Sequence, residues 1–170
     1  MLDFESMPPA IATTLAALAC ALAASSALGA ELRGTILRIE DGDTVTLLAQ
    51  RREVRLRLDS IDAPELAQPF GKQSRKALAA LCAGKQARVT QLNEDPVRGR
   101  IGRLRCGRVD ASTHQVRSGM AWVYVRYADP QSPLYRLEYE ARLKRQGLWS
   151  DAHAVAPWDW RQRKTASKNW

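Results

Sequence analysis

The sequence predicts an α+β domain, mainly β with helices, in which a small Greek-key barrel carries helices on its outside. Three β-rich segments follow one another between residues 32 and 61, and a helix-forming segment comes directly after them. Two further β-rich segments and two helical segments bring the chain to residue 146. This order, β-β-β-α-β-β-α-α, is compatible with a closed barrel decorated by helices. The 170 residues are enough for one such domain with a hydrophobic core.

The first three strands are expected at Leu32–Ile39, Thr44–Ala49 and Val54–Ile61. In the third strand apolar and charged residues alternate, which is the period of a half-buried strand. Arg57 therefore points away from the face that Leu56 and Leu58 bury. Asp41-Gly42 turns the first strand into the second, and residues 50–52 turn the second into the third.

Residues 70–83 contain strong helix formers and end at Gly84, a residue type that favours the position after a helix. The later strands are expected at residues 86–92 and 100–106, with a polar loop over residues 93–99 between them. A short helix follows at residues 112–119, an apolar extended or irregular stretch at 121–127, and an amphipathic helix at 132–146. Ser132-Pro133 predicts the cap and first residue of that last helix, and Trp149 is expected to pack it onto the barrel.

The chain is strongly basic, with 26 Lys and Arg against 18 Asp and Glu. Residues 1–30 contain Asp3 and Glu5 but no Lys or Arg, so the remainder sets 26 positive side chains against 16 negative ones, a formal charge of +10. Such a charge favours nucleic acid or another polyanion over a neutral small molecule. A basic surface that only aids solubility is the alternative.

Residues 11–29 are uncharged and rich in Ala and Leu, which is typical of an export signal. We therefore expect a signal over residues 1–30, a folded domain over 31–150 and a C-terminal tail over 151–170, with the protein exported to the periplasm or secreted. An uncleaved membrane anchor over residues 11–29 and a lipidated Cys20 are the alternatives. In the tail, residues 157–160 are expected to dock on the domain and residues 161–170 to be mostly disordered.

Without residues 1–30 two cysteines remain, Cys82 and Cys106. An even count in an exported domain is the pattern of a disulfide, and we expect Cys82 to be bonded to Cys106. Two buried free thiols are the alternative.

Three carboxylates, those of Asp43, Asp62 and Glu65, lie in two short acidic turns that flank β-rich sequence. Their oxygens are suitable ligands for a hard cation, and Arg57 and Arg100 offer guanidinium forks for a phosphate. An acidic site in a basic chain is typical of a metal-dependent enzyme that acts on a polyanion. Alternatively, the two Asp residues only complete turns, and Arg57 is a surface residue paired with a nearby carboxylate.

Several stretches together resemble the staphylococcal-nuclease-like (thermonuclease) family over about residues 32–150. They are Ile39-Glu-Asp-Gly-Asp-Thr-Val45, Arg57-Leu-Asp-Ser-Ile-Asp-Ala-Pro-Glu65, Gly99-Arg100, Gly119-Met-Ala-Trp-Val-Tyr124 and Gly147-Leu-Trp-Ser150. The first two at this spacing are highly specific. The resemblance implies an OB-fold, a five-stranded Greek-key barrel with three helices.

The resemblance also implies a Ca²⁺ cofactor held by the carboxylates of Asp43 and Asp62 and by the carbonyl of Ala63. It makes Glu65 the group that orients or deprotonates the attacking water. Arg57 and Arg100 become the phosphate contacts. The loop before Arg100 departs from the family pattern, so Arg98 is the alternative for that role.

On the substrate side the resemblance implies that a base stacks on Tyr127, with Tyr124 as a second contact or a core residue. The implied function is hydrolysis of phosphodiester bonds in DNA and RNA outside the cytoplasm, with single strands favoured and no obligate protein partner. Two other classes stay open. One is an OB-fold nucleic-acid-binding protein without catalysis, and the other is a polyanion-binding protein of the cell envelope.

Overall fold

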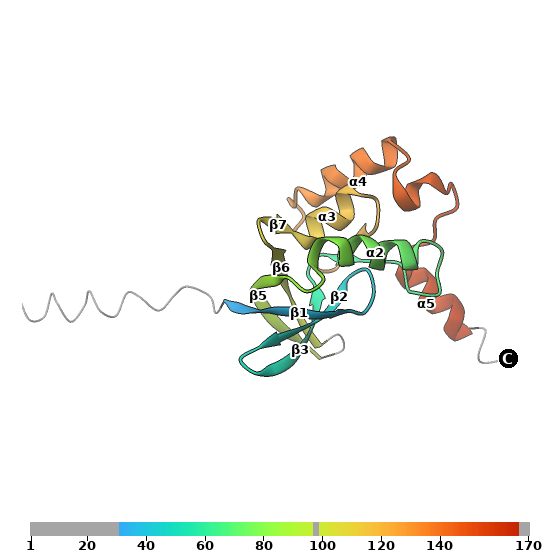
Figure 1. The fold of residues 1–170 in the computed structure, drawn as a ribbon. Helices are drawn as coiled ribbons and strands as arrows, with labels where there is room; N and C mark the ends of the chain where they lie inside the picture. The colour runs from blue at the N-terminus through green and yellow to red at the C-terminus, as the bar shows by residue number, and fades with distance from the viewer. Residues whose placement is uncertain (1–30, 97–98, 167–170) are drawn as a thin grey trace, which may run out of the picture.

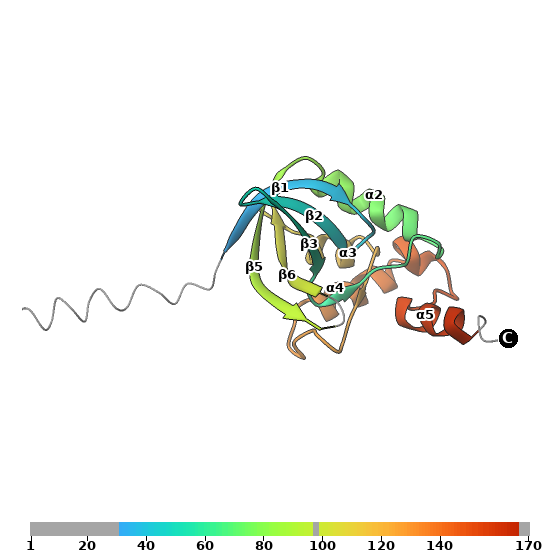
Figure 2. The same cartoon turned by 90° about the horizontal axis from the view of Figure 1, so that it is seen from below.

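The computed structural model describes residues 31–96 and 99–166, and the expected export signal lies outside them. Its centre is a closed five-stranded barrel, which confirms the predicted α+β barrel fold (Figures 1 and 2). Its strands are β1 (Leu32–Ile39), β2 (Thr44–Ala49), β3 (Arg52–Leu58), β5 (Gln86–Asp95) and β6 (Gly99–Cys106). Neighbours along β3-β2-β1-β5-β6 are antiparallel, and a parallel pairing of β3 with β6 closes the barrel.

The bounds of β1 and β2 are those predicted, whereas the third strand differs at both ends. A two-residue turn at Gln50 and Arg51, both with positive φ, lets β3 begin at Arg52. The predicted strand to Ile61 is wrong, because Ser60 has a φ of 65° and interrupts it. After that turn β4 (Ile61–Asp62) pairs with β8 (Trp122–Val123) outside the barrel.

Of the predicted loop over residues 93–99, residues 93–95 and residue 99 are strand. β5 continues to Asp95, which pairs with Gly99 at the start of β6. Polar side chains on this exposed hairpin hid its strand character, since backbone pairing in a solvent-exposed hairpin needs no apolar pattern. A local irregularity between Thr90 and Asn93 bends β5, with Gln91 at a φ of 52°.

Four α-helices are described where three were expected. They are α2 (Gly71–Cys82), α3 (Ala111–Arg117), α4 (Leu134–Leu143) and α5 (Pro157–Ala166), with a short strand β7 (Val109–Asp110) before α3 and a 3₁₀ turn η2 (Gly147–Ser150) after α4. The expectation that residues 161–166 are disordered is wrong, because α5 runs through them. The cap of α4 is Pro133 rather than Ser132, whose Oγ accepts a bond from the Leu134 amide at 3.3 Å.

The barrel interior is filled by aliphatic side chains with almost no exposure, among them Ile36, Leu47, Leu56, Val89 and Leu104. A disulfide between Cys82 and Cys106 links the end of α2 to the end of β6, as expected. No helix within residues 31–96 and 99–166 is both long and apolar enough to cross a membrane.

Trp149 was expected to pack the last helix onto the barrel, but its ring packs on β8, outside the barrel. Its ring meets Trp122 edge-on with the centroids 5.2 Å apart, and the guanidinium of Arg142 lies 3.7 Å from the centroid of Trp149. Trp149 therefore joins α4 to the strand that pairs with β4. This contact holds the helical layer against the acidic turn that follows β4.

Candidate active site

The first acidic turn connects β1 to β2 and buries Asp43, which is 1% exposed. Asp41 Oδ1 accepts a bond from the Asp43 amide at 2.9 Å, a side-chain to backbone contact that shapes the turn. Asp43 Oδ1 accepts from Thr44 Oγ1 at 2.9 Å, and Asp43 Oδ2 accepts from the Ala63 amide at 2.8 Å. This last bond ties the first acidic turn to the second.

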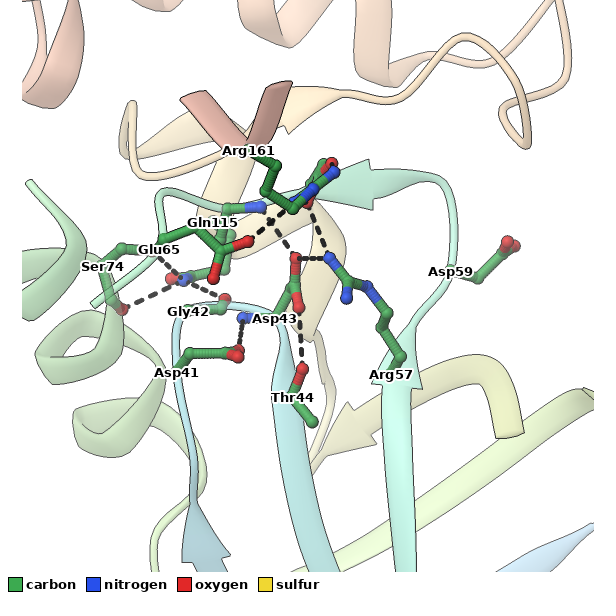
Figure 3. A network of polar contacts seen from close by, with 12 residues as sticks. Asp41, Gly42, Asp43, Thr44, Arg57, Asp59, Glu65, Ser74, Gln115 and Arg161 are labelled. Atoms are coloured by element: carbon green, nitrogen blue, oxygen red, sulfur yellow. Dashed lines mark hydrogen bonds and ion pairs between the residues drawn. The ribbon is translucent and has the colours of Figure 1, made fainter. Parts of the chain in front are cut away.

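Gln115 and Ser74 hold the back of this turn. Gln115 Nε2 donates to the carbonyl of Gly42 at 2.6 Å and contacts Ser74 Oγ at 3.1 Å (Figure 3). A Cβ at Gly42 would lie 1.9 Å from Ser74 Oγ, so only glycine fits here. Neither Gln115 nor Ser74 was predicted from the sequence. For Gln115 there is one indication. It is a polar residue that lies on a helix between Ala111 and Val116, on the buried side.

The second acidic turn follows β4 and carries Asp62, Ala63 and Glu65. Asp62 is 0% exposed, whereas the Glu65 side chain is 38% exposed. The carbonyl of Glu65 accepts from the Gln68 amide at 2.8 Å, which fixes the chain directly after the turn. The turn therefore offers one buried and one solvent-facing carboxylate side by side.

Arg57 on β3 joins the two turns. Its Nη2 donates to Asp43 Oδ2 at 3.1 Å and to Asp62 Oδ1 at 2.7 Å, and its side chain is 19% exposed. Arg57 therefore points into the acidic site rather than toward a surface partner. Its Nε is buried and has no hydrogen-bond partner among the described residues.

The pKa values of Asp43 and Arg57 are both raised in this cluster. Burial raises the pKa of the Asp43 carboxyl to about 7, against the attraction of Arg57, and the carboxylates of Asp41 and Asp62 add to the rise. Burial opposes the charge of Arg57, but Asp43 and Asp62 outweigh it and raise the pKa of its guanidinium. The buried carboxyl of Asp43 is therefore harder to ionise than a free one, even with Arg57 beside it.

Arg161 on α5 is the second cation of the site, and the sequence analysis missed it. Its Nη2 donates to Asp62 Oδ2 at 2.7 Å and its Nη1 donates to Glu65 Oε1 at 2.8 Å. Figure 3 shows its side chain reaching from α5 toward Glu65 and the turn of Asp43. Nearly a hundred residues separate Arg161 from these partners, so no local pattern could reveal the contact.

Arg100 lies on the exposed β5–β6 hairpin, where its Nε pairs with Glu94 Oε1 at 2.7 Å. Within the described ranges it contacts none of the three site carboxylates. Tyr127 donates to Asp95 Oδ2 at 2.7 Å, and its ring lies against Tyr124 with centroids 5.4 Å apart. The structure therefore brings Asp43, Asp62, Ala63, Glu65 and Arg57 together. Arg100, Tyr124 and Tyr127 have their described partners outside this cluster.

The donor set of the cluster fits a hard cation. Asp43, Asp62 and Glu65 offer only oxygen atoms as ligands. When all three are ionised, they outnumber the two guanidinium groups that they face. In the part of the chain that is described, no three His, Cys, Asp or Glu side chains converge closely enough to enclose an ion. The guanidinium groups of Arg57 and Arg161 lie between the carboxylates instead.

Comparison with known proteins shows the family to which the chain belongs. The family model described as staphylococcal nuclease homologue matches residues 55–151. The protein ParB of Escherichia coli is 44% identical over 159 residues, covering 86% of this chain and 88% of ParB. A protein called micrococcal nuclease from Shigella flexneri is 40% identical over 152 residues, covering 82% of this chain and 84% of its own length. The chain therefore belongs to the staphylococcal nuclease family of hydrolases.

Proposed function

We propose that this protein is a Ca²⁺-dependent phosphodiesterase that hydrolyses DNA and RNA, with single strands favoured. The observation that carries the proposal is the meeting of two acidic turns at the Arg57 guanidinium. A bond from the Ala63 amide to Asp43 Oδ2 at 2.8 Å joins the same two turns. Their union in a buried cluster with an unused guanidinium donor supports a site for a cation and a phosphate.

Asp43, Asp62 and the carbonyl of Ala63 would hold the ion, which prefers several oxygen ligands and tolerates irregular geometry. When bound, the ion would supply positive charge that polarises the phosphate and favours ionisation of a water molecule. Glu65, whose carboxylate is partly open to solvent, would orient that water and accept its proton.

Arg57 would bind the phosphate through the donors that Asp43 and Asp62 leave unused. A guanidinium fork matches two phosphate oxygens and gains strength as charge builds on them in the transition state. The role of Arg100 rests on the family resemblance, and its exposed pairing with Glu94 leaves it at the surface until substrate arrives. If Arg98→Ala lowers cleavage and Arg100→Ala does not, the role belongs to Arg98.

Three features support an exported nuclease of this kind. The charge of +10 outside residues 1–30 suits a polyanionic substrate. A disulfide such as Cys82–Cys106 forms and persists in an oxidising compartment. The apolar segment at residues 11–29 has the composition of an export signal.

Cleavage of single-stranded DNA and RNA by the full chain, with Ca²⁺ and with excess chelator, tests the proposal. Cleavage that requires Ca²⁺ is expected. Salt-sensitive binding of nucleic acid without cleavage would favour an inactive binding barrel. Equal binding of any polyanion, again without cleavage, would favour a cell-envelope binding protein.

A further inference from the structure

Helix α5 places a cation on both carboxylates of the second acidic turn. Arg161 Nη1 lies 3.3 Å from Asp62 Oδ1, Arg161 Nη2 lies 2.7 Å from Asp62 Oδ2, and the Nη1 also contacts Glu65 Oε1. Arg57 Nη2 donates a hydrogen bond to Asp62 Oδ1 at 2.7 Å. Both oxygens of Asp62 are therefore bonded to guanidinium groups.

This contact comes from a segment that is anchored on the domain. Gln68 Nε2 donates to the carbonyl of Val155 at 2.5 Å just before α5, and Pro157 at its start is buried. The ring of Trp158 lies against Tyr124 with centroids 5.4 Å apart. These contacts lie on residues near the site, so α5 is held where Arg161 reaches the carboxylates.

Arg161 and a metal ion would need the same oxygens. Asp62 is the proposed ion ligand and Glu65 the proposed acceptor of the water proton, and Arg161 engages both. Each of these bonds joins two charged groups, and such bonds are stronger than neutral ones. An ion that ligates Asp62 would share an oxygen with Arg161 or displace it, and in either case the two positive charges would repel each other.

We propose that Arg161 is a tethered counter-cation, which neutralises Asp62 and Glu65 before the ion arrives and competes with Ca²⁺ for them. The inference rests on the proposed function. The two binding events are linked. A stronger contact of Arg161 with Asp62 and Glu65 lowers the affinity for Ca²⁺, and bound Ca²⁺ weakens the Arg161 contact by the same free energy. The segment that carries Arg161 lies beyond residue 151, where the match to the family model ends.

Competition between Arg161 and Ca²⁺ predicts that removing the Arg161 charge raises the affinity for Ca²⁺. Arg161→Gln keeps a polar side chain of similar reach and removes the charge. Ca²⁺ should then bind about tenfold more tightly. This is the gain expected when the ion no longer has to compete with one partly exposed, charge-assisted hydrogen bond. The same variant should unfold at a lower temperature without Ca²⁺ and gain more from added Ca²⁺ than wild type does. If Arg161 served only to pack α5 against the domain, Arg161→Gln would lower the stability but would not raise the affinity for Ca²⁺.

Arg163→Gln is the matched control. Arg163 lies on α5, is exposed, and its side chain makes no hydrogen bond or ion pair within the described ranges. The substitution removes the same charge from the same helix. Its effect on Ca²⁺ affinity should stay within about twofold, since a solvent-exposed charge is screened.

The experiment is calorimetric titration of CaCl₂ into the metal-free full chain, its Arg161→Gln and Arg163→Gln variants, and Arg161→Lys. Lysine keeps the charge but cannot bridge two carboxylates with a planar fork, so an affinity between wild type and Arg161→Gln is expected. Arg161→Lys also decides the matter if Arg161→Gln does not fold.

Unchanged or weaker Ca²⁺ binding in Arg161→Gln, or an equal gain in Arg163→Gln, would overturn the inference. Wild type would then still bind Ca²⁺ and cleave nucleic acid, and the proposed function would stand. An absence of Ca²⁺ binding in all four proteins would instead overturn the metal dependence of the proposed function, and this inference with it.

Discussion

Removing Arg57 should destabilise the metal-free protein far more than removing any other arginine of its strand. Arg57 contacts two carboxylates whose side chains are 2% and 0% exposed. Breaking a buried ion pair by removing one partner costs about 3 to 5 kcal/mol, because a buried charge loses its counter-ion. Asp62 keeps Arg161, and Asp43 keeps the Ala63 amide and the Thr44 hydroxyl, so the lower end applies.

The expected loss for Arg57→Ala is thus about 3 kcal/mol of unfolding free energy. Arg55→Ala is the control, since Arg55 lies on the same strand and pairs with Glu40 at 2.6 Å while 61% exposed. Such a surface pair contributes about 0 to 1 kcal/mol. Urea denaturation in the presence of chelator measures both variants. If Arg57→Ala lost no more than Arg55→Ala, the two acidic turns would not depend on this guanidinium.

Three further predictions concern other parts of the structure. Replacing Cys82 and Cys106 by Ala should lower the unfolding free energy by about 3 kcal/mol in the chain-entropy model, measured by denaturation, while thiol labelling of the denatured wild type should find both thiols blocked. Gln115→Ala should cost about 1 to 3 kcal/mol of stability, because the carbonyl of Gly42 loses its buried donor, and a loss below 0.5 kcal/mol would contradict that role. In a Glu65→Gln background, Tyr127→Ala should weaken single-stranded DNA binding by about 1 to 3 kcal/mol, whereas Tyr127→Phe, which keeps the ring, should bind nearly as wild type.

Local sequence pattern predicted the barrel well, because its strands are rich in β-branched and aliphatic residues and are bounded by turn residues, and β3 also alternates apolar and charged residues. It placed β1 and β2 correctly and put α2 within a residue of its bounds. It failed where a single backbone conformation decided the outcome. The alternation from Val54 to Ile61 gives no sign that Ser60 adopts a positive φ and ends the strand.

The site was predictable as far as its residues lie in short motifs. Asp43, Asp62 and Glu65 were found because two acidic turns are visible in the sequence, and the structure brings them together around Arg57. Arg161 was not found, because its helix is polar on most sides and its partners are 96 and 99 residues away. Such a contact depends on tertiary packing alone.

The central claim is that the two acidic turns form one Ca²⁺ site that drives cleavage. The most direct test compares Asp43→Asn and Asp62→Asn with Asp59→Asn, whose carboxylate points away from the cluster in Figure 3. Calcium titration and cleavage of single-stranded DNA are measured on the same samples. Both site variants should lose Ca²⁺ binding and cleavage together while staying folded, and Asp59→Asn should behave as wild type. Full cleavage by either site variant, or by wild type in excess chelator, would contradict the account.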